Sequence, residues 1–290
     1  MRTRGLLLCG GVIAMSVWTF GAARAEEATG SERSTLQEEY QKEIRSSAEP
    51  DAPLVIMDPV VVTATRAPKQ LTQVPGAVSV IDQKQILQGR PAVGVDETLR
   101  IVPGVQTERR FGPDDMRISI RGSGVRSTFG VRSVRILIDG IPLTEVDGQT
   151  RLEPIDLDAV ARVEVLRGPN STLYGNASAG VINYVLEEGS KDNRYVEPRF
   201  VFGSYDFSKY RLKAAGANDK FSWMANYSFL DYGGYRDQSV TRNQRFLGKF
   251  KYTFNDHSDL SLVVTYGQMD GDIPGSLFRS EFENSPRLQQ

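Results

Sequence analysis

The sequence predicts two structural regions, a small α+β domain over residues 69–190 and then the first strands of an antiparallel transmembrane β-barrel over residues 191–290. Two observations indicate this division. Before residue 190 the chain is rich in Gly, Val, Ile and Arg, whereas after about Tyr195 it is dense in Tyr, Phe and Trp. The later region also alternates apolar and polar residues over segments of about ten residues, which is typical of strands that cross a membrane.

The predicted α+β domain is divided at regular intervals by glycine and proline, which end its short elements. Asp82 is expected to cap a helix over residues 83–88. Residues 93–102 carry apolar side chains on one face and predict a second helix, which ends at Pro103-Gly104. Alternation of apolar and polar residues predicts short strands. These strands are residues 77–81, 116–122, 134–140, 160–166 and 181–185.

The region after residue 190 contains longer amphipathic segments. Residues 221–232 place their aromatic side chains on one face, and residues 244–254 place Phe and Tyr opposite Arg245, Lys249 and Lys251. A soluble β-sandwich would show the same period with strands of about five or six residues. The segments here are longer, and their turns are very short at alternate ends. The pattern therefore favours a membrane-spanning barrel over a sandwich.

The first 25 residues have the features of a secretory signal peptide. Arg2 and Arg4 precede an apolar stretch that ends at Phe20, and an A-x-A cleavage site ends at Ala25. A membrane anchor is the alternative, but the apolar stretch is short for a helix that spans a bilayer. Export of the chain is therefore predicted, and the polar residues 26–57 are interpreted as a linker.

The composition excludes several functions. The 35 basic and 36 acidic residues nearly balance, so no excess of positive charge indicates nucleic acid as a partner. The only cysteine, Cys9, lies in the signal peptide, and the only histidine, His257, lies in a predicted turn. Metal sites built from His and Cys, and nucleophilic pairs that need either residue, are therefore not expected. We predict no cofactor, no metal site and no enzyme activity.

Several segments occur in an order typical of one protein family. They are residues 58–66, LRIVPGV at 99–105, ISIRG at 118–122, ILIDGIPL at 136–143, VEVLRGPNSTLYG at 163–175 and AGVIN at 179–183. Over about residues 56–290 the chain resembles the N-terminal portion of TonB-dependent outer-membrane receptors. The resemblance implies that residues 69–190 are a plug domain inside a barrel of about 22 strands. It also implies import of a scarce nutrient, such as a ferric siderophore or cobalamin.

By this resemblance, residues 58–68 are a TonB box that follows the linker. The expected partner-binding residues are Asp58, Pro59, Val60, Val61, Val62, Thr63 and Ala64. The β-branched run reads as an unpaired edge strand, to which TonB would add a strand of its own. TonB, driven by the proton gradient of the inner membrane, would then pull the plug open. The alternative is that the segment is the first strand of the plug itself.

The resemblance also implies roles for polar side chains of the plug. Those in the predicted apical loops are expected to hydrogen-bond an anionic ferric chelate, of the siderophore or ferric-citrate type, because arginine suits carboxylates. These candidate ligand residues are Arg109, Arg110, Arg126 and Gln149. The alternative is that they are solvated apical side chains. Ion pairs within the plug and with the polar barrel wall are also expected. The candidate ion-pairing residues are Arg121, Glu164 and Arg167.

The chain departs from the family in length, since only about five of the 22 barrel strands precede Gln290. Open strand edges leave backbone groups unsatisfied in lipid. We therefore expect the N-terminal part of a longer receptor, or the product of a degraded reading frame. Its expected location is the outer membrane of a Gram-negative bacterium, with the plug and TonB box facing the periplasm. The alternative is an exported, plug-like periplasmic module that binds a partner without transport.

Overall fold

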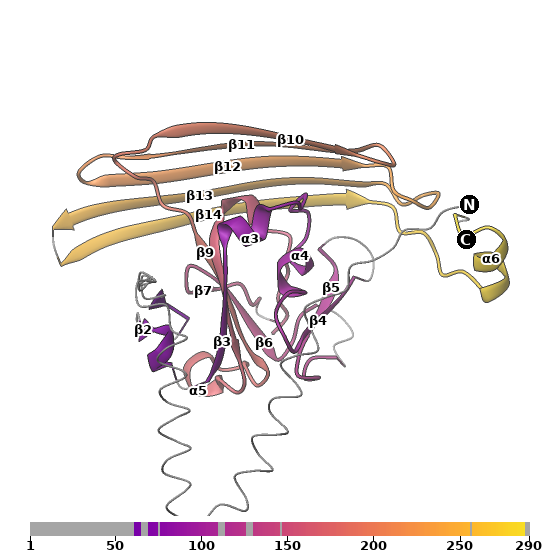
Figure 1. Cartoon of the computed structure of the whole chain (residues 1–290), viewed down its shortest axis with the longest axis horizontal. Coiled ribbons are helices and arrows are strands. Elements are labelled where there is room, and N and C mark those ends of the chain that lie inside the picture. Colours follow the sequence, from indigo (N-terminus) through magenta and orange to yellow (C-terminus); the bar gives the residue numbers. More distant parts are fainter. Residues whose placement is uncertain are drawn as a thin grey trace, which may run out of the picture. The chain divides into compact units, whose positions relative to one another are not determined.

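The computed structural model describes residues 61–64, 69–74, 76–109, 114–125, 130–145, 147–255 and 257–287. These residues lie in one compact unit, Pro59–Gln290. Two five-stranded sheets organise it, one of short strands and one of long strands (Figure 1). Among the described residues, no helix is both long and apolar enough to cross a membrane.

The sheet of short strands has the order β3-β8-β9-β6-β7. Its strands are β3 (Ala77–Asp82), β8 (Val160–Arg167), β9 (Gly180–Leu186), β6 (Val134–Ile138) and β7 (Ile141–Pro142). β6 and β9 are parallel, and the other neighbouring strands are antiparallel. Alternating apolar side chains of these strands form the core, where Ile136, Val163 and Ile182 are fully buried.

Smaller elements surround this sheet. β4 (Val105–Arg109) pairs with β5 (Met116–Ile120), and β1 (Val61–Val62) pairs with β2 (Lys69–Gln70). The helices of the described residues are η1 (Leu71–Gln73), α3 (Gln83–Leu87), α4 (Asp96–Leu99), η2 (Leu157–Ala159), α5 (Ser171–Tyr174) and α6 (Arg279–Asn284).

The two predicted helices have different outcomes. The first is confirmed, because α3 begins after Asp82, whose side chain accepts a hydrogen bond from the Gln85 backbone N–H in a capping box. The second is shorter than predicted and is limited to α4. The residue that precedes α4, Val95, has no side chain that caps the helix, and after Leu99 the chain forms a turn in which the Val102 N–H bonds the Leu99 carbonyl. The predicted face is correct, since Val95, Leu99 and Val102 are all buried.

The sheet of long strands is antiparallel, with β10 to β14 in chain order. They are β10 (Tyr195–Gly203), β11 (Phe207–Ala217), β12 (Phe221–Tyr232), β13 (Thr241–Asn255) and β14 (Ser258–Gly271). These strands have 9 to 15 residues, so they exceed the usual length in soluble sandwiches. The predicted fold class, an α+β domain followed by long antiparallel strands, is confirmed.

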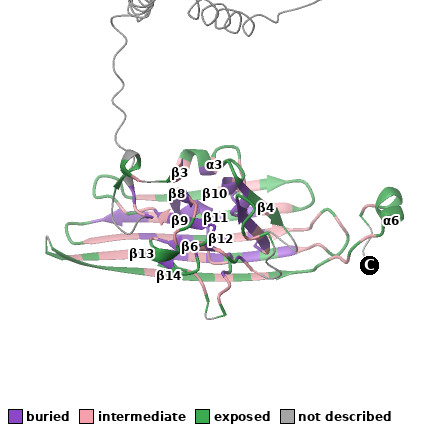
Figure 2. Cartoon of the chain, turned by 90° about the horizontal axis from the view of Figure 1, so that it is seen from below, coloured by how far each residue is buried: buried purple, intermediate pink, exposed green. Residues whose placement is uncertain are grey.

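The two faces of the long-stranded sheet differ in burial. On β11, Lys209, Arg211 and Lys213 are nearly fully buried, whereas Tyr210 and Leu212 between them are 41% and 52% exposed. Buried stretches of the same kind appear along the neighbouring strands (Figure 2). We call the face with the lysines the inner face and the face with Leu212 the outer face. A sheet in water buries its apolar side, so this inverted pattern indicates a polar lumen wall with an apolar outer surface.

Candidate functional site

The inner face of the long strands is held to the α+β domain by buried carboxylates. The central one is Asp158 in η2, whose side chain is 1% exposed. Lys209 Nζ lies 2.6 Å from its Oδ2, and Arg199 Nη1 lies 2.9 Å from its Oδ1. Arg211 Nε lies 3.7 Å from the same Oδ1. Three cations from β10 and β11 therefore converge on one carboxylate that water does not reach.

A second buried carboxylate, Asp156, lies two residues earlier. Its Oδ2 accepts hydrogen bonds from Asn226 Nδ2 and Ser228 Oγ on β12, each at 2.7 Å. Burial alone would raise the pKa of Asp156. The charges of Lys209 and Arg245, with hydrogen bonds from Ser228 and the Asp158 backbone N–H, outweigh burial and hold that pKa below its ordinary value. Asp156 therefore stays ionised while it links the α+β domain to the sheet.

This lowered pKa predicts loss of stability in acid. The contribution of Asp156 is fully present above its unfolded pKa, about 3.8, and is lost as the pH falls through the lower folded pKa. We expect the thermal unfolding midpoint to drop as the pH falls below about 4, and the Asp156→Asn variant to show a smaller drop over the same interval. Calorimetry of both proteins measures this difference. If the unfolding midpoint fell equally with pH in both proteins, the lowered pKa of Asp156 would be contradicted.

β13 carries further charged side chains of the inner face. Arg245, which is 2% exposed, pairs with Asp114, and its Nη1 donates to the Val93 carbonyl at 3.1 Å. Lys249 Nζ lies 2.9 Å from Asp139 Oδ2 and 2.7 Å from Glu188 Oε1. β13 thus has contacts with several separate segments of the α+β domain.

The charges of the two regions are complementary. Six cations of the inner face each pair with a carboxylate of the α+β domain or of the segment that follows β9. The cations are Arg199, Lys209, Arg211, Lys213, Arg245 and Lys249, and the carboxylates are Asp114, Asp139, Asp158, Glu187 and Glu188. Burial of either set without the other would be strongly unfavourable, because a buried charge would then have no partner. The carboxylates of the α+β domain and of the segment after β9 therefore neutralise the cations of the inner face.

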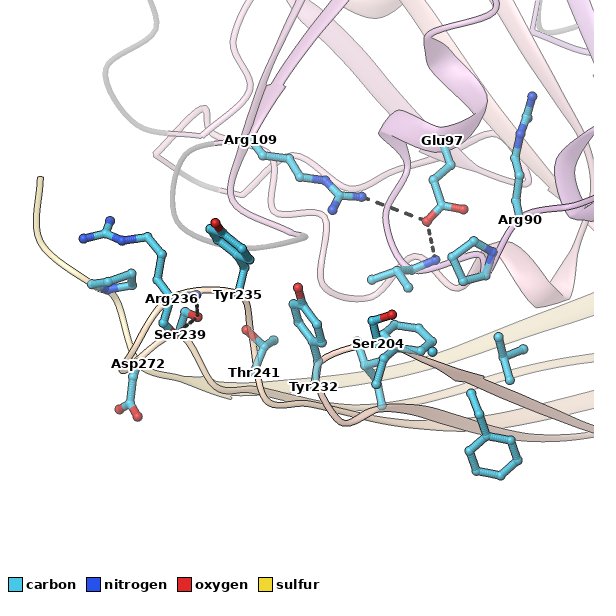
Figure 3. Close-up of a pocket in the computed structure, with 18 of the residues that line it drawn as sticks. Arg90, Glu97, Arg109, Ser204, Tyr232, Tyr235, Arg236, Ser239, Thr241 and Asp272 are labelled. Carbon is cyan, nitrogen blue, oxygen red and sulfur yellow. Dashed lines mark hydrogen bonds and ion pairs between the residues drawn. The ribbon is translucent and has the colours of Figure 1, made fainter. Parts of the chain in front are cut away.

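A cavity of about 1240 Å³ lies where the α+β domain faces the ends of the long strands. Arg90, Glu97 and Arg109 line it from the α+β domain, and Tyr232 and Tyr235 line it from the strand ends (Figure 3). Aromatic rings and arginines together suit an organic anion with apolar parts. The cavity is the best candidate ligand site among the described residues.

The predicted ligand residues have different outcomes. Arg109 lines the cavity, where its Nη2 lies 2.7 Å from Asp96 Oδ1 and 4.0 Å from Glu97 Oε1. Gln149 does not line this cavity. Arg110 and Arg126 lie outside the described residues. Tyr232, Tyr235 and Arg236 were not among the predicted ligand residues, although two aromatics and an arginine beside a Gly-Gly pair are a usable signal for a binding loop.

The predicted TonB box is described only in part. Asp58, Pro59 and Val60 lie outside the described residues. Val61 and Val62 form β1, and the side chains of Val62 and Ala64 are fully buried. Thr63 donates hydrogen bonds to Glu164 of β8. In this structure residues 61–64 are docked on the α+β domain, and β1 pairs with β2 and not with a strand of the five-stranded sheet of short strands.

The three residues predicted to form ion pairs also have different outcomes. Glu164 pairs with Arg162, whose Nε lies 2.9 Å from its Oε1. Arg167 instead donates to the Pro103 carbonyl at 2.7 Å and to Ser79 Oγ at 3.2 Å. Among the described residues, neither Arg167 nor the exposed Arg121 forms an ion pair. The expected pairs at these two arginines stay predictions, because they include pairs with a barrel wall of which the structure describes five strands. No carboxylate of the described residues comes within reach of either guanidinium.

Comparisons with known proteins agree with this architecture. Residues 70–182 match the family "TonB-dependent Receptor Plug Domain". The pyoverdine outer membrane receptor FpvA from Pseudomonas aeruginosa PAO1 has a similar fold, with a TM-score of 0.59 and 20% identity over 71% of this chain and 30% of that chain. For the ferric yersiniabactin uptake receptor FyuA from Yersinia pestis the TM-score is 0.53 and the identity 22%, over 67% of this chain and 32% of that chain. For the copper transporter OprC the TM-score is 0.56 and the identity 21%, over 69% of this chain and 31% of that chain.

These likenesses have a defined scope. At 20–22% identity the solved structures are similar in fold alone, and this chain spans about a third of their length. The family match is to a domain of receptors rather than of enzymes, as the sequence predicted. Residues 70–182 thus match a TonB-dependent receptor plug domain, and the chain continues from them into a five-stranded antiparallel sheet that aligns with the start of the barrel in such receptors.

Proposed function

We propose that this chain supplies the plug and the opening barrel strands of an outer-membrane receptor for energy-dependent uptake of an iron chelate, either a ferric siderophore or ferric citrate. One observation carries the proposal. The long strands bury a cationic inner face against the plug and leave an apolar outer face exposed, with Leu212 52% and Phe200 62% exposed. Such a division suits a wall with lipid on one side and an occluded, polar lumen on the other.

The proposed energy source is TonB, which would add a strand to residues 58–64 and pull on the plug. Strand addition uses backbone hydrogen bonds and requires little of the side chains. The plug is held to the wall by ion pairs and also by apolar contacts of Ala215, Met224 and Leu247 with its core. The ion-paired part of this interface separates with little exposure of apolar surface to water, which supports a plug that moves.

The proposed ligand is an anionic chelate that binds in the cavity beside Arg109. Charge supports this choice, because Arg90, Arg109, Arg199 and Arg236 line the cavity against the carboxylates Glu97 and Asp272. Among the similar solved structures, FpvA is described with pyoverdine and FyuA as a ferric yersiniabactin receptor, whereas OprC is described as a copper transporter. Arg110, Arg126 and Gln149 remain proposed contacts of the ligand.

Uptake of radioactive iron tests this function. A full-length receptor gene that contains this chain is expressed in a Gram-negative strain that lacks its own ferric-chelate receptors, and ferric citrate and ferric siderophores are supplied in turn. We expect uptake that disappears when TonB is deleted, with the chain recovered in the outer-membrane fraction. Arg109→Gln should weaken binding of the transported chelate about tenfold, because a hydrogen bond to a charged group is lost.

Arg279→Gln is the matched control, since the Arg279 side chain is 93% exposed and, among the described residues, forms an ion pair with Glu283 of α6 alone. This variant should bind the chelate with unchanged affinity. Recovery of the chain only in the periplasmic fraction, or uptake that is the same without TonB, would overturn the proposed function. Periplasmic recovery would favour an exported interaction module instead.

A further inference from the structure

The segment at the end of the proposed TonB box is bound by one buried carboxylate. Glu164 lies on β8 and is fully buried. Its Oε2 accepts hydrogen bonds from the backbone N–H groups of Thr63 at 2.9 Å and Ala64 at 2.8 Å. Thr63 Oγ1 also lies 3.1 Å from Oε2 and 3.2 Å from Oε1. One carboxylate therefore binds two successive peptide groups and a hydroxyl from a segment about 100 residues away in sequence.

Neighbouring polar groups complete this arrangement, which we call the Glu164 clamp. Asn183 Nδ2 lies 3.2 Å from Thr63 Oγ1 and 3.4 Å from Glu164 Oε2. On the other side of the segment, Tyr174 donates its hydroxyl to the Ala64 carbonyl at 2.9 Å. Both peptide N–H groups and the carbonyl at this point are therefore satisfied by side chains of the plug, in the way that a neighbouring strand would satisfy them.

Apolar contacts add to the clamp. The side chains of Val62 and Ala64 are 0% exposed and pack in a cluster with Leu137, Leu166, Tyr174, Ala177 and Val181. This cluster is separate from the main core of the plug, which contains Ile136 and Val163. The segment can therefore leave its site without opening the main core.

The position of Glu164 determines what a pull on the tether would reach. β8 lies between β3 and β9, and Glu164 is paired with Val80 on one side and Asn183 on the other. While the clamp is closed, force on residues N-terminal to Thr63 acts on the middle of the sheet. Once it is open, the carboxylate keeps Arg162 and Asn183 but loses its bonds to Thr63 and Ala64. A buried carboxylate that loses hydrogen-bond donors is strongly destabilised, so opening of the clamp costs free energy.

We propose that Glu164 is a latch that keeps the end of the tether docked on the plug and sets how readily this segment is released to a partner strand. The role of the partner rests on the proposed function. The latch itself is a property of the plug and requires no partner. Glu164 is accordingly a positioning residue, which acts on the tether and not on the ligand.

Thiol labelling tests the latch without TonB or ligand. Cys9 is the only cysteine and is replaced by serine, so that Val62→Cys provides one reporter in the full chain. A buried thiol reacts only through the opened segment, and its labelling rate therefore measures the opening equilibrium. Glu164→Gln should accelerate labelling of this reporter at least about tenfold, since hydrogen bonds to a charged group are lost.

Two controls distinguish a latch from general destabilisation. Ile136→Cys reports on the main core, and its labelling rate should be unchanged by Glu164→Gln. Glu97→Gln is the matched variant, because Glu97 also accepts two successive backbone N–H groups, those of Ala92 and Val93, each at 2.9 Å. It holds a different loop, so it should leave labelling at residue 62 unchanged.

A second variant keeps the test decisive if Glu164→Gln does not fold. Tyr174→Phe removes the hydroxyl that binds the Ala64 carbonyl and leaves Glu164 in place, and it should accelerate labelling in the same direction by a smaller factor. Equal acceleration at residues 62 and 136, or no acceleration at residue 62, would overturn the latch. Either result leaves the uptake experiment untouched, so failure of the latch and failure of the proposed function are distinguishable.

Discussion

Replacing Asp158 with asparagine should lower the free energy of unfolding by about 3–5 kcal/mol, the range measured when one partner of a buried ion pair is removed. Lys209, 2% exposed, would keep its charge while losing the carboxylate that lies 2.6 Å from its Nζ. Arg199 would lose its charged partner at 2.9 Å, and of the described carboxylates Arg211 would keep Glu197. Asparagine has the same shape, so loss of charge is the dominant change.

Urea unfolding of the chain in detergent micelles, followed by tryptophan fluorescence, measures this effect. Asp219→Asn is the matched control. It breaks an ion pair of 2.9 Å with Lys191, but both side chains are exposed, so the free energy of unfolding should hardly change. If Asp158→Asn were as mild as this control, the buried ion pairs would not be what holds the plug to the wall.

A charge on the outer face should have the second large effect. Leu212 lies in the middle of β11 and points away from the plug, between the inward Arg211 and Lys213. Leu212→Arg should destabilise the chain in a bilayer by about 2–4 kcal/mol, as arginine does near the midplane on the lipid side of a barrel strand. On a surface in water the same substitution would change stability by at most about 0.5 kcal/mol.

Folding of a full-length receptor that contains this chain into phospholipid vesicles, compared with the apolar control Leu212→Met, measures the difference. Methionine is similar in volume and should fold almost as the original chain does. Equal folding of the arginine and methionine variants would mean that water and not lipid covers the outer face. The wall assignment would then be wrong, whatever the stability of the plug.

Much of the fold was predictable because its signals are local. The capping box at Asp82 needs only residues within one turn of α3, and the long strands follow from alternation along each segment. The helix expected over residues 93–102 was predicted too long for the same reason. Apolar spacing identified its buried face, but it carried no information on the missing cap before α4.

The candidate site was less predictable because its contacts join distant residues. Glu164 was expected to form ion pairs, and its pair with Arg162 is present, but its bonds to Thr63 and Ala64 link positions about 100 residues apart. No pattern within one segment indicates such a contact. Tyr232 and Tyr235 became candidates for the same reason, since only the fold brings their loop beside Arg109.

By itself, then, the sequence determined which residues form strands and that each long strand has one polar and one apolar face, because alternation is a property of neighbouring residues. Only the tertiary structure decided that the polar face is the buried one. That outcome depends on carboxylates such as Asp114 and Asp158 meeting Arg245 and Lys209, which are 131 and 51 residues away. Burial of charge is tolerated only where an opposite charge is brought to meet it, and only the folded chain does so.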